Sequence, residues 1–375
     1  MAKKAYIGID GVAKVVKKAY IGVDGVAKLI KTAYIGIGGV ARPCGFGGGE
    51  LVYYGTATGL SAARFLLAAT SVGRYALFGG GLTTDYTNVV DAYDESLTIS
   101  KPTILSQRRS ELAATSIGGY ALFGGGGGDS GGTYNKSNVV DAYDESLTRS
   151  IPTGLKVARG NLSATTVGDY ALFAGGDACV DAYNKSLTRS NPTSISETIY
   201  SMGATNVGDY ALFGGGLYSY DGGSSAVYAY DKALTQTLPT GLSVARLYLA
   251  AARAGDYALF GGGRLNTTTL TSYSTVDAYD KSLTRSIPTE LSVARGHLAA
   301  TTLGDYALFG GGFTREDYSV VDAYYTSLTR TNPGNLATAR GKFAATSVGS
   351  FALFGGGNTY AGNSKSSTVD AYTII

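Results

Sequence analysis

One short stretch, Tyr-Ala-Leu-Phe-Gly-Gly-Gly, returns along the whole chain and constrains its fold more than any other feature. It begins at Tyr75, Tyr120, Tyr210, Tyr257 and Tyr306, with the variants YALFAGG at Tyr170 and FALFGGG at Phe351. From the first copy to the last, the mean spacing is (351 − 75)/6 = 46 residues. A period of about 40–50 residues with four strand signals in each copy is typical of β-propeller blades.

The four strand signals are clearest in the third copy. There we expect strands at 160–166, 170–173, 180–183 and 187–190, with a tight two-residue turn at Gly168-Asp169 between the first two. The glycines after Phe173 predict a close backbone approach, where a side chain would collide with a neighbouring strand or blade.

Counting the third strands also gives seven, but the seventh copy ends as DAYTII and lacks a fourth strand. The segment 51–56 (LVYYGT) precedes the first copy and has no partner of its own. We therefore expect it to complete the last blade, because that pairing removes a free sheet edge. The sequence predicts an all-β fold, with a seven-bladed propeller over residues 44–375.

Residues 1–43 carry a different and shorter repeat, with a period of 14 residues. Its copies read AYIGIDGVAKVVKK, AYIGVDGVAKLIKT and AYIGIGGVAR, and each holds a two-residue hairpin signal, at Asp10-Gly11, Asp24-Gly25 and Gly38-Gly39. We expect a small six-stranded β-hairpin meander. Such a short chain without metal or disulfide usually needs a partner for stability, so this arm is expected to dock onto other subunits or a larger assembly. The alternative is that it packs on the rim of the following domain.

Composition excludes several classes of protein. The net charge of +3 and the 16% of charged residues do not indicate a nucleic-acid binder. The N-terminus lacks the apolar run of a signal peptide, and no apolar stretch is long enough to insert in a membrane. His297 is the only histidine, and we expect it to be a solvent-facing or partly buried filler. No catalytic triad or metal site can be assembled, so we expect neither enzyme activity nor a cofactor.

The copies resemble kelch repeats. Kelch blades have a leading Arg, an aromatic-led strand ending in Gly-Gly and a strand ending near Tyr, and Arg159, Tyr170, Gly175-Gly176 and Tyr183 match these positions. The resemblance covers about residues 51–375 and implies a kelch-like propeller. The Trp usual on the outer strand is replaced by Leu97 and its equivalents. Kelch-type copper oxidases need several His ligands, which this chain does not have.

The segments between the second and third strands vary in length and content while the scaffold stays nearly constant. Variable loops on a rigid frame are where binding usually resides, and their Tyr, Ser, Asn, Gly and Asp content suits adaptable contacts with a glycan or a protein. The alternative is that these loops are solvated and bind nothing. The candidate ligand-binding residues in them are Asp85, Tyr86, Tyr134, Asn135, Tyr218, Tyr220, Asp221, Arg264, Asn266, Tyr273, Arg315, Asp317, Tyr318, Tyr360 and Asn363.

A leading arginine stands before the first strand of every copy except the fourth. We expect each to pair with backbone carbonyls or with a carboxylate of the adjoining blade; a ring that holds an anion is the alternative. The fourth copy has Ile199 in this position and Tyr228 in place of the third-strand Asp. The six arginines are Arg64, Arg109, Arg159, Arg246, Arg295 and Arg340.

The tandem YIGIDGVAK-type units of the arm resemble segments of phage and prophage structural proteins of Gram-positive bacteria, some of which continue into kelch repeats. This resemblance implies a virion protein present in several copies, with the arm docked on the particle and the propeller loops facing a host surface glycan or protein. The alternative is a kelch adaptor between proteins, in the cytoplasm or at the bacterial cell surface.

Overall fold

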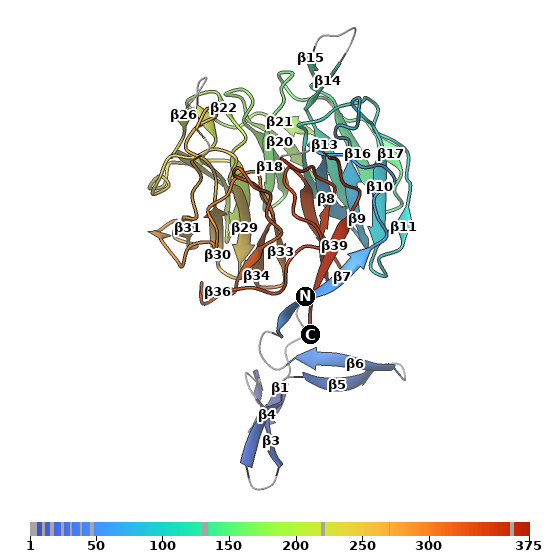
Figure 1. The fold of residues 1–375 in the computed structure, drawn as a ribbon, viewed down its shortest axis with the longest axis vertical. Helices are drawn as coiled ribbons and strands as arrows, with labels where there is room; N and C mark the ends of the chain where they lie inside the picture. Colours follow the sequence, from blue (N-terminus) through green and yellow to red (C-terminus); the bar gives the residue numbers. More distant parts are fainter. Residues whose placement is uncertain are drawn as a thin grey trace.

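The computed structural model describes residues 49–129, 134–218, 222–269, 271–360 and 364–375, together with the backbone of six short strands between residues 6 and 45. Every regular element in these residues is a β-strand (Figure 1). Among them are seven four-stranded antiparallel sheets. The architecture is all-β and consistent with a β-propeller.

Each four-stranded sheet, here called repeat 1 to repeat 7, uses its strands in chain order, except that β7 supplies the fourth strand of repeat 7. The first strands are β8 (Ala68–Val72), β12 (Ala113–Ile117), β18 (Ser163–Val167), β23 (Gly203–Val207), β29 (Ala250–Ala254), β33 (Ala299–Leu303) and β37 (Ala344–Val348). The second strands are β9 (Tyr75–Gly79), β13 (Tyr120–Gly124), β19 (Tyr170–Ala174), β24 (Tyr210–Gly214), β30 (Tyr257–Gly261), β34 (Tyr306–Gly310) and β38 (Phe351–Gly355).

The fourth strands of repeats 1 to 6 are two residues long, whereas β7 in repeat 7 has seven residues. The third strands are β10 (Val90–Asp94), β16 (Val140–Asp144), β20 (Asp181–Asn184), β27 (Val227–Asp231), β31 (Val276–Tyr279), β35 (Val321–Tyr324) and β39 (Val369–Ile374). The fourth strands are β11 (Ile99–Ser100), β17 (Arg149–Ser150), β21 (Arg189–Ser190), β28 (Gln236–Thr237), β32 (Arg285–Ser286), β36 (Arg330–Thr331) and β7 (Leu51–Ala57).

The YALF strands are buried on both faces because each sheet packs between two neighbours. The core clusters join successive repeats: one of them holds Leu122 of repeat 2 together with Phe173 of repeat 3. A Cβ added to Gly124 would lie 2.7 Å from Cε1 of that Phe173 ring. The close approach predicted for the glycines after Phe173 is confirmed at Gly175, where an added Cβ would lie 2.9 Å from the Ile199 carbonyl oxygen. Gly355 of repeat 7 meets Phe78 of repeat 1 as Gly124 meets Phe173.

The first and last parts of this region lie side by side. Each first strand lies beside the first strand of the next repeat, and β37 lies beside β8. Strand β7 pairs antiparallel with β39 from Leu51–Ile374 to Ala57–Val369. Backbone hydrogen bonds join Glu50 and Ile375 in both directions, each 3.0 Å long. Glu50, which stands between the arm and β7, thus lies beside Ile375, at the lower end of the sheets in Figure 1.

The fourth strands differ from the sequence expectation. A strand was expected at 187–190, but β21 begins at Arg189, and Leu187 lies in a turn with φ of 58°. The reason is local: Asn184 Oδ1 accepts hydrogen bonds from the backbone amides of Ser186 and Thr188, at 2.9 and 3.0 Å, and closes the turn. The same left-handed leucine recurs at Leu97, Leu147, Leu234, Leu283 and Leu328.

The arm also differs from expectation. Its six strands form three separate two-stranded sheets, β1 (Tyr6–Ile9) with β2 (Val12–Val15), β3 (Ala19–Val23) with β4 (Val26–Ile30), and β5 (Thr32–Ile37) with β6 (Val40–Gly45). In the described residues no ladder joins one hairpin to the next, so the single six-stranded meander was wrong. Sequences such as Lys17-Lys18 between hairpins lack the Gly or Asn that a tight hairpin turn requires.

Candidate functional site

Two kinds of segment meet at one end of the sheets, here called the loop face. They are the loops that follow the second strands and the leads into the first strands. Isolated backbone bridges tie them together, for example Phe65 to Leu82, Leu247 to Arg264 and Gly296 to Phe313. In Figure 1 this end carries β14 (Gly127–Asp129), β15 (Tyr134–Lys136), β22 (Ile199–Tyr200) and β26 (Gly222–Gly223); β22 and β26 flank β25 (Leu217–Tyr218) in one small sheet.

The sequence-predicted binding residues are spread over this face rather than gathered at one place. The exposed ones are Asp85, Asn135, Tyr218, Arg315 and Tyr360. Tyr86, Asn266, Tyr273, Asp317 and Tyr318 are half-buried, and Arg264 is buried. Tyr134 is described only by its backbone in β15, and Tyr220, Asp221 and Asn363 lie outside the described residues.

Some of these side chains hold loops in place. Asp317 Oδ1 accepts a hydrogen bond of 2.7 Å from the backbone amide of Tyr360, which joins the loops of repeats 6 and 7. Arg264 Nη2 donates to the carbonyl of Thr314 at 3.2 Å, which joins the loops of repeats 5 and 6. Asn266 Oδ1 accepts from the amide of Thr269 at 2.6 Å and closes its own turn. These three contacts stabilise the shape of the loop face.

The leading arginines are buried ion pairs and not an anion-binding ring. Arg64 Nη1 lies 2.8 Å from Asp91 Oδ2, and both side chains are 0% exposed. The five further pairs have the same form: Arg109–Asp141, Arg159–Asp181, Arg246–Asp277, Arg295–Asp322 and Arg340–Asp370. The expected pairing with backbone carbonyls is confirmed, as Arg64 Nη2 donates to the Phe78 carbonyl at 3.1 Å. Each carboxylate belongs to the arginine's own repeat, so the expected alternative, a carboxylate of the adjoining blade, was wrong. The reason is that Asp91 is the cross-strand partner of Phe78 in the same sheet, so a side chain that reaches the Phe78 carbonyl also reaches the Asp91 carboxylate.

Repeat 4 replaces the whole charged group by neutral residues. Ile199 and Tyr228 occupy the positions of the Arg and the Asp, and both are buried. The Tyr228 hydroxyl lies 2.7 Å from Ser196 Oγ. Because a lone buried charge is costly, the two substitutions are compatible only when they occur together.

The leads into the first strands bring seven side chains together around the axis that the seven first strands surround. These residues are here called the axial ring. Each stands two residues after the leading position and has a φ between 52° and 56°. Backbone amide-to-carbonyl bonds run around it, such as Glu111 to Leu66 at 3.0 Å, Asn161 to Glu111 at 2.9 Å and Leu66 to Lys342 at 3.0 Å. The axial ring consists of Leu66, Glu111, Asn161, Ser201, Tyr248, His297 and Lys342.

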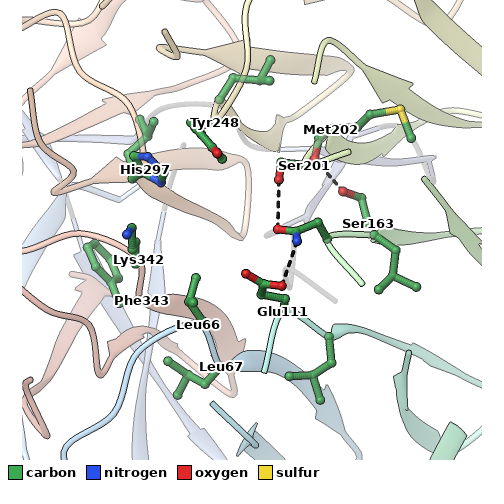
Figure 2. A pocket seen from close by; sticks show the side chains of 15 residues that line it. Leu66, Leu67, Glu111, Ser163, Ser201, Met202, Tyr248, His297, Lys342 and Phe343 are labelled. Carbon is green, nitrogen blue, oxygen red and sulfur yellow. Dashed lines mark hydrogen bonds between the residues drawn. The ribbon is translucent and has the colours of Figure 1, made fainter. Parts of the chain in front are cut away.

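The axial ring surrounds a cavity of about 280 Å³, shown in Figure 2. The side chains of Glu111, Ser201 and Tyr248 direct their oxygen atoms toward its open centre, and His297 directs a ring nitrogen toward it. The apolar residue that follows each ring position forms the wall behind them: Leu67, Leu112, Leu162, Met202, Leu249, Leu298 and Phe343. The cavity therefore has mostly polar side chains at its opening and apolar side chains behind them.

One side of the cavity is a hydrogen-bonded polar chain. Asn161 Nδ2 donates to Glu111 Oε2 at 2.8 Å, and Ser201 Oγ donates to Asn161 Oδ1 at 3.3 Å. These two bonds fix which way the Asn161 amide faces and link three repeats through their side chains. This side of the site presents a carboxylate, an amide and a hydroxyl.

The other side is aromatic and cationic. His297 stacks between Tyr248 and Phe313, with ring centroids 3.9 and 4.6 Å away. Lys342 Nζ lies 5.6 Å from the Phe313 centroid, within range of a cation–π contact. Burial lowers the pKa of His297 well below its usual value, and Lys342 and Arg264 lower it further, so the imidazole is neutral at neutral pH. Burial also lowers the pKa of Lys342.

Sequence reasoning missed the axial ring as a site. It expected His297 to be a solvent-facing or partly buried filler; the residue is half-buried, but it lines the cavity. A signal was present: Asn161, Tyr248 and Lys342 occupy the same place in other copies. Aligning all seven copies at this one position would have shown seven different residues.

Comparisons with known proteins support the fold and nothing finer. No protein-family model matches the chain, and no curated protein sequence matches it. The solved structure of YjhT is similar to it, with a TM-score of 0.60 and 12% sequence identity over 74% of this chain and 99% of that one. At this identity the similarity speaks only for the β-propeller-like architecture.

Two features are absent from the described residues. None of their elements is a helix long and apolar enough to cross a membrane. No group of three or more His, Cys, Asp or Glu side chains in the same residues has the proximity needed to hold a metal ion.

Proposed function

We propose that this chain is a non-enzymatic structural and binding protein of a phage virion. The arm, residues 1–43, docks it on the particle, and the loop face recognises a glycan or protein on the host surface. In this proposal residues 44–375 are a seven-bladed kelch-like β-propeller whose ring is closed by β7. The seven four-stranded sheets, the neighbouring positions of β37 and β8 and the β7–β39 pairing support that closure.

One observation carries the proposal: Glu50, through which the chain leads from the arm into the sheets, and the loop face are at opposite ends of the sheets. Glu50, next to the arm, is bonded to Ile375 after the end of β39, whereas the loop face holds the start of that strand at Val369. A protein attached through its arm therefore directs the axial ring and the variable loops away from the attachment point. This polarity is what a particle-surface binding protein requires.

The experiment is labelling of the source particles with an antibody against the propeller, followed by negative-stain imaging. We expect label on the particle surface. A chain lacking residues 1–43 should fold but lose its place on the particle, whereas the double variant Tyr218→Ala/Arg315→Ala should keep it. Detection of the protein only in the free cytosol, with a captured protein partner, would contradict the virion role and favour the kelch adaptor instead.

A further inference from the structure

The axial ring is unlike every scaffold position of the repeats because no residue occurs in it twice. The position three residues after each ring residue is a half-buried alanine in all seven repeats: Ala69, Ala114, Ala164, Ala204, Ala251, Ala300 and Ala345. The wall position behind the ring is apolar in all seven. Positions that only build the sheets are thus nearly uniform, so packing does not explain seven different side chains at one height on the axis.

The chain contains an internal comparison for this argument. Within the described part of the chain, the non-glycine residues with left-handed φ fall into two series, the axial ring and the turn leucines. The turn series is leucine in all six of its members, and these pack against core clusters, as Leu187 does against the cluster that contains Phe173. A uniform series is the mark of a structural requirement. The axial ring has the same backbone conformation without any uniformity.

The conformation of the axial ring also has an energetic cost. A left-handed φ costs a non-glycine residue roughly 1–2 kcal/mol, and glycine adopts it freely. The chain has 55 glycines and places them at many other positive φ values, yet none stands at the seven ring positions. Retaining seven strained side chains where glycine would relieve the strain indicates that the side chains themselves are used.

We propose that the axial ring is a binding site for one sugar residue, the end of a host-surface glycan chain. This inference rests on the proposed function and names its ligand. Glu111, Asn161 and Ser201 provide the carboxylate, amide and hydroxyl that bind sugar hydroxyl groups. Tyr248 and the neutral His297 add further hydrogen-bonding groups on the opposite side, and Lys342 adds a cation.

The dimensions favour a single sugar over an extended chain. The cavity, about 280 Å³, lies near the lower end of the range of ligand pockets, about 300–1,000 Å³. Seven different side chains around a repeating frame give the site a distinct chemistry in each direction, so a ligand can enter in only one orientation. The variable loops stand around the same end and would contact the following sugars.

The test is titration of the full-length protein with free monosaccharides, namely hexoses, N-acetylhexosamines and uronic acids, followed by saturation-transfer NMR. The site variants are Glu111→Gln and Lys342→Met, which keep side-chain length. The matched controls are Glu145→Gln and Lys185→Met, since Glu145 and Lys185 line a cavity at the opposite end, beside the turns between first and second strands. Thermal unfolding should show the same folded state for all four variants.

We expect at least one of these sugars to bind, with affinity reduced tenfold or more by either site variant and less than twofold by either control. Absence of binding at millimolar concentrations, or equal losses in site and control variants, would overturn the inference. Binding reduced only by the loop variant Tyr218→Ala/Arg315→Ala would also overturn it, while leaving the proposed function in place. Sugar binding at the axis by a protein absent from any particle would instead refute the virion role alone.

Discussion

Replacing Arg64 by Ile should destabilise the protein strongly, although the substitution is apolar and fills a buried site. Arg64 Nη1 donates to Asp91 Oδ2 at 2.8 Å, and neither side chain is exposed. Without Arg64, the Asp91 carboxylate keeps a 3.2 Å hydrogen bond from the Ser61 amide but no cation. Breaking a buried pair from one side costs about 3–5 kcal/mol, because the remaining charge is uncompensated. Asp91→Tyr alone should cost a similar amount.

The double variant Arg64→Ile/Asp91→Tyr should recover most of that loss. It transfers the arrangement of repeat 4, where Ile199 and Tyr228 are buried together. Ser61 stands at the position of Ser196, so it can meet the new tyrosine hydroxyl as Ser196 meets Tyr228 at 2.7 Å. Replacing a buried ion pair by well-packed residues is often neutral, so we expect the double variant within about 2 kcal/mol of the parent.

Urea unfolding followed by circular dichroism measures all four proteins, and the free energies of unfolding are compared at equal m-values. The double-mutant cycle should give a coupling energy of about 3 kcal/mol or more between positions 64 and 91. A loss below about 1 kcal/mol in Arg64→Ile, or a double variant as unstable as the two single losses added, would refute the reasoning about paired replacement.

Three further predictions concern packing and titration. Gly124→Ala should lower the free energy of unfolding by about 1–3 kcal/mol because its Cβ would lie 2.7 Å from the Phe173 ring. The control is Gly222→Ala, whose Cβ would meet only the Tyr218 carbonyl oxygen, at 3.5 Å. Equal losses of the two variants in urea unfolding would contradict the packing argument. The pKa of folded His297 lies well below its usual value of 6.5, so the unfolded chain binds a proton first as pH falls through 6.5. The free energy of unfolding should therefore decrease by up to about 1.4 kcal/mol per pH unit below that pH. His297→Gln should remove this contribution to the pH dependence of the free energy of unfolding, measured from pH 7.5 to 5.5. Burial raises the pKa of the third-strand tyrosines such as Tyr143 and Tyr372, so an alkaline titration followed at 295 nm should leave them un-ionised until the protein unfolds; a single smooth transition of all 29 tyrosines near their usual pKa would argue against this core.

The sequence predicted most of the sheet structure because the information is local. The YALF strands, their glycine exits and the positions of the variable loops all follow from one repeating pattern. Leu187 was assigned wrongly to a strand because a left-handed residue is usually recognised in a sequence as a glycine, and this position is a leucine. Only the turn closed by Asn184 reveals its conformation.

The candidate site was less accessible to sequence reasoning because it depends on three-dimensional convergence. Glu111 and Lys342 are far apart in the chain, and only the arrangement of the leads around the axis brings them to one cavity. In the same way, Ile199 and Tyr228 stood out as separate irregularities. Their common cause, the absence of an ion pair in repeat 4, becomes visible only when the other six arginines are seen beside their aspartates.

The pairing of β7 with β39 determines how the protein would carry a mechanical load. A pull on the arm enters the sheets at Leu51, whose partner is Ile374 at the end of the last strand. Tension directed along β7 shears the whole ladder from Leu51 to Ala57 at once, instead of opening its hydrogen bonds one after another. Strand β7, which completes repeat 7, is thus also the element through which force from a tethered particle would reach a ligand bound at the loop face.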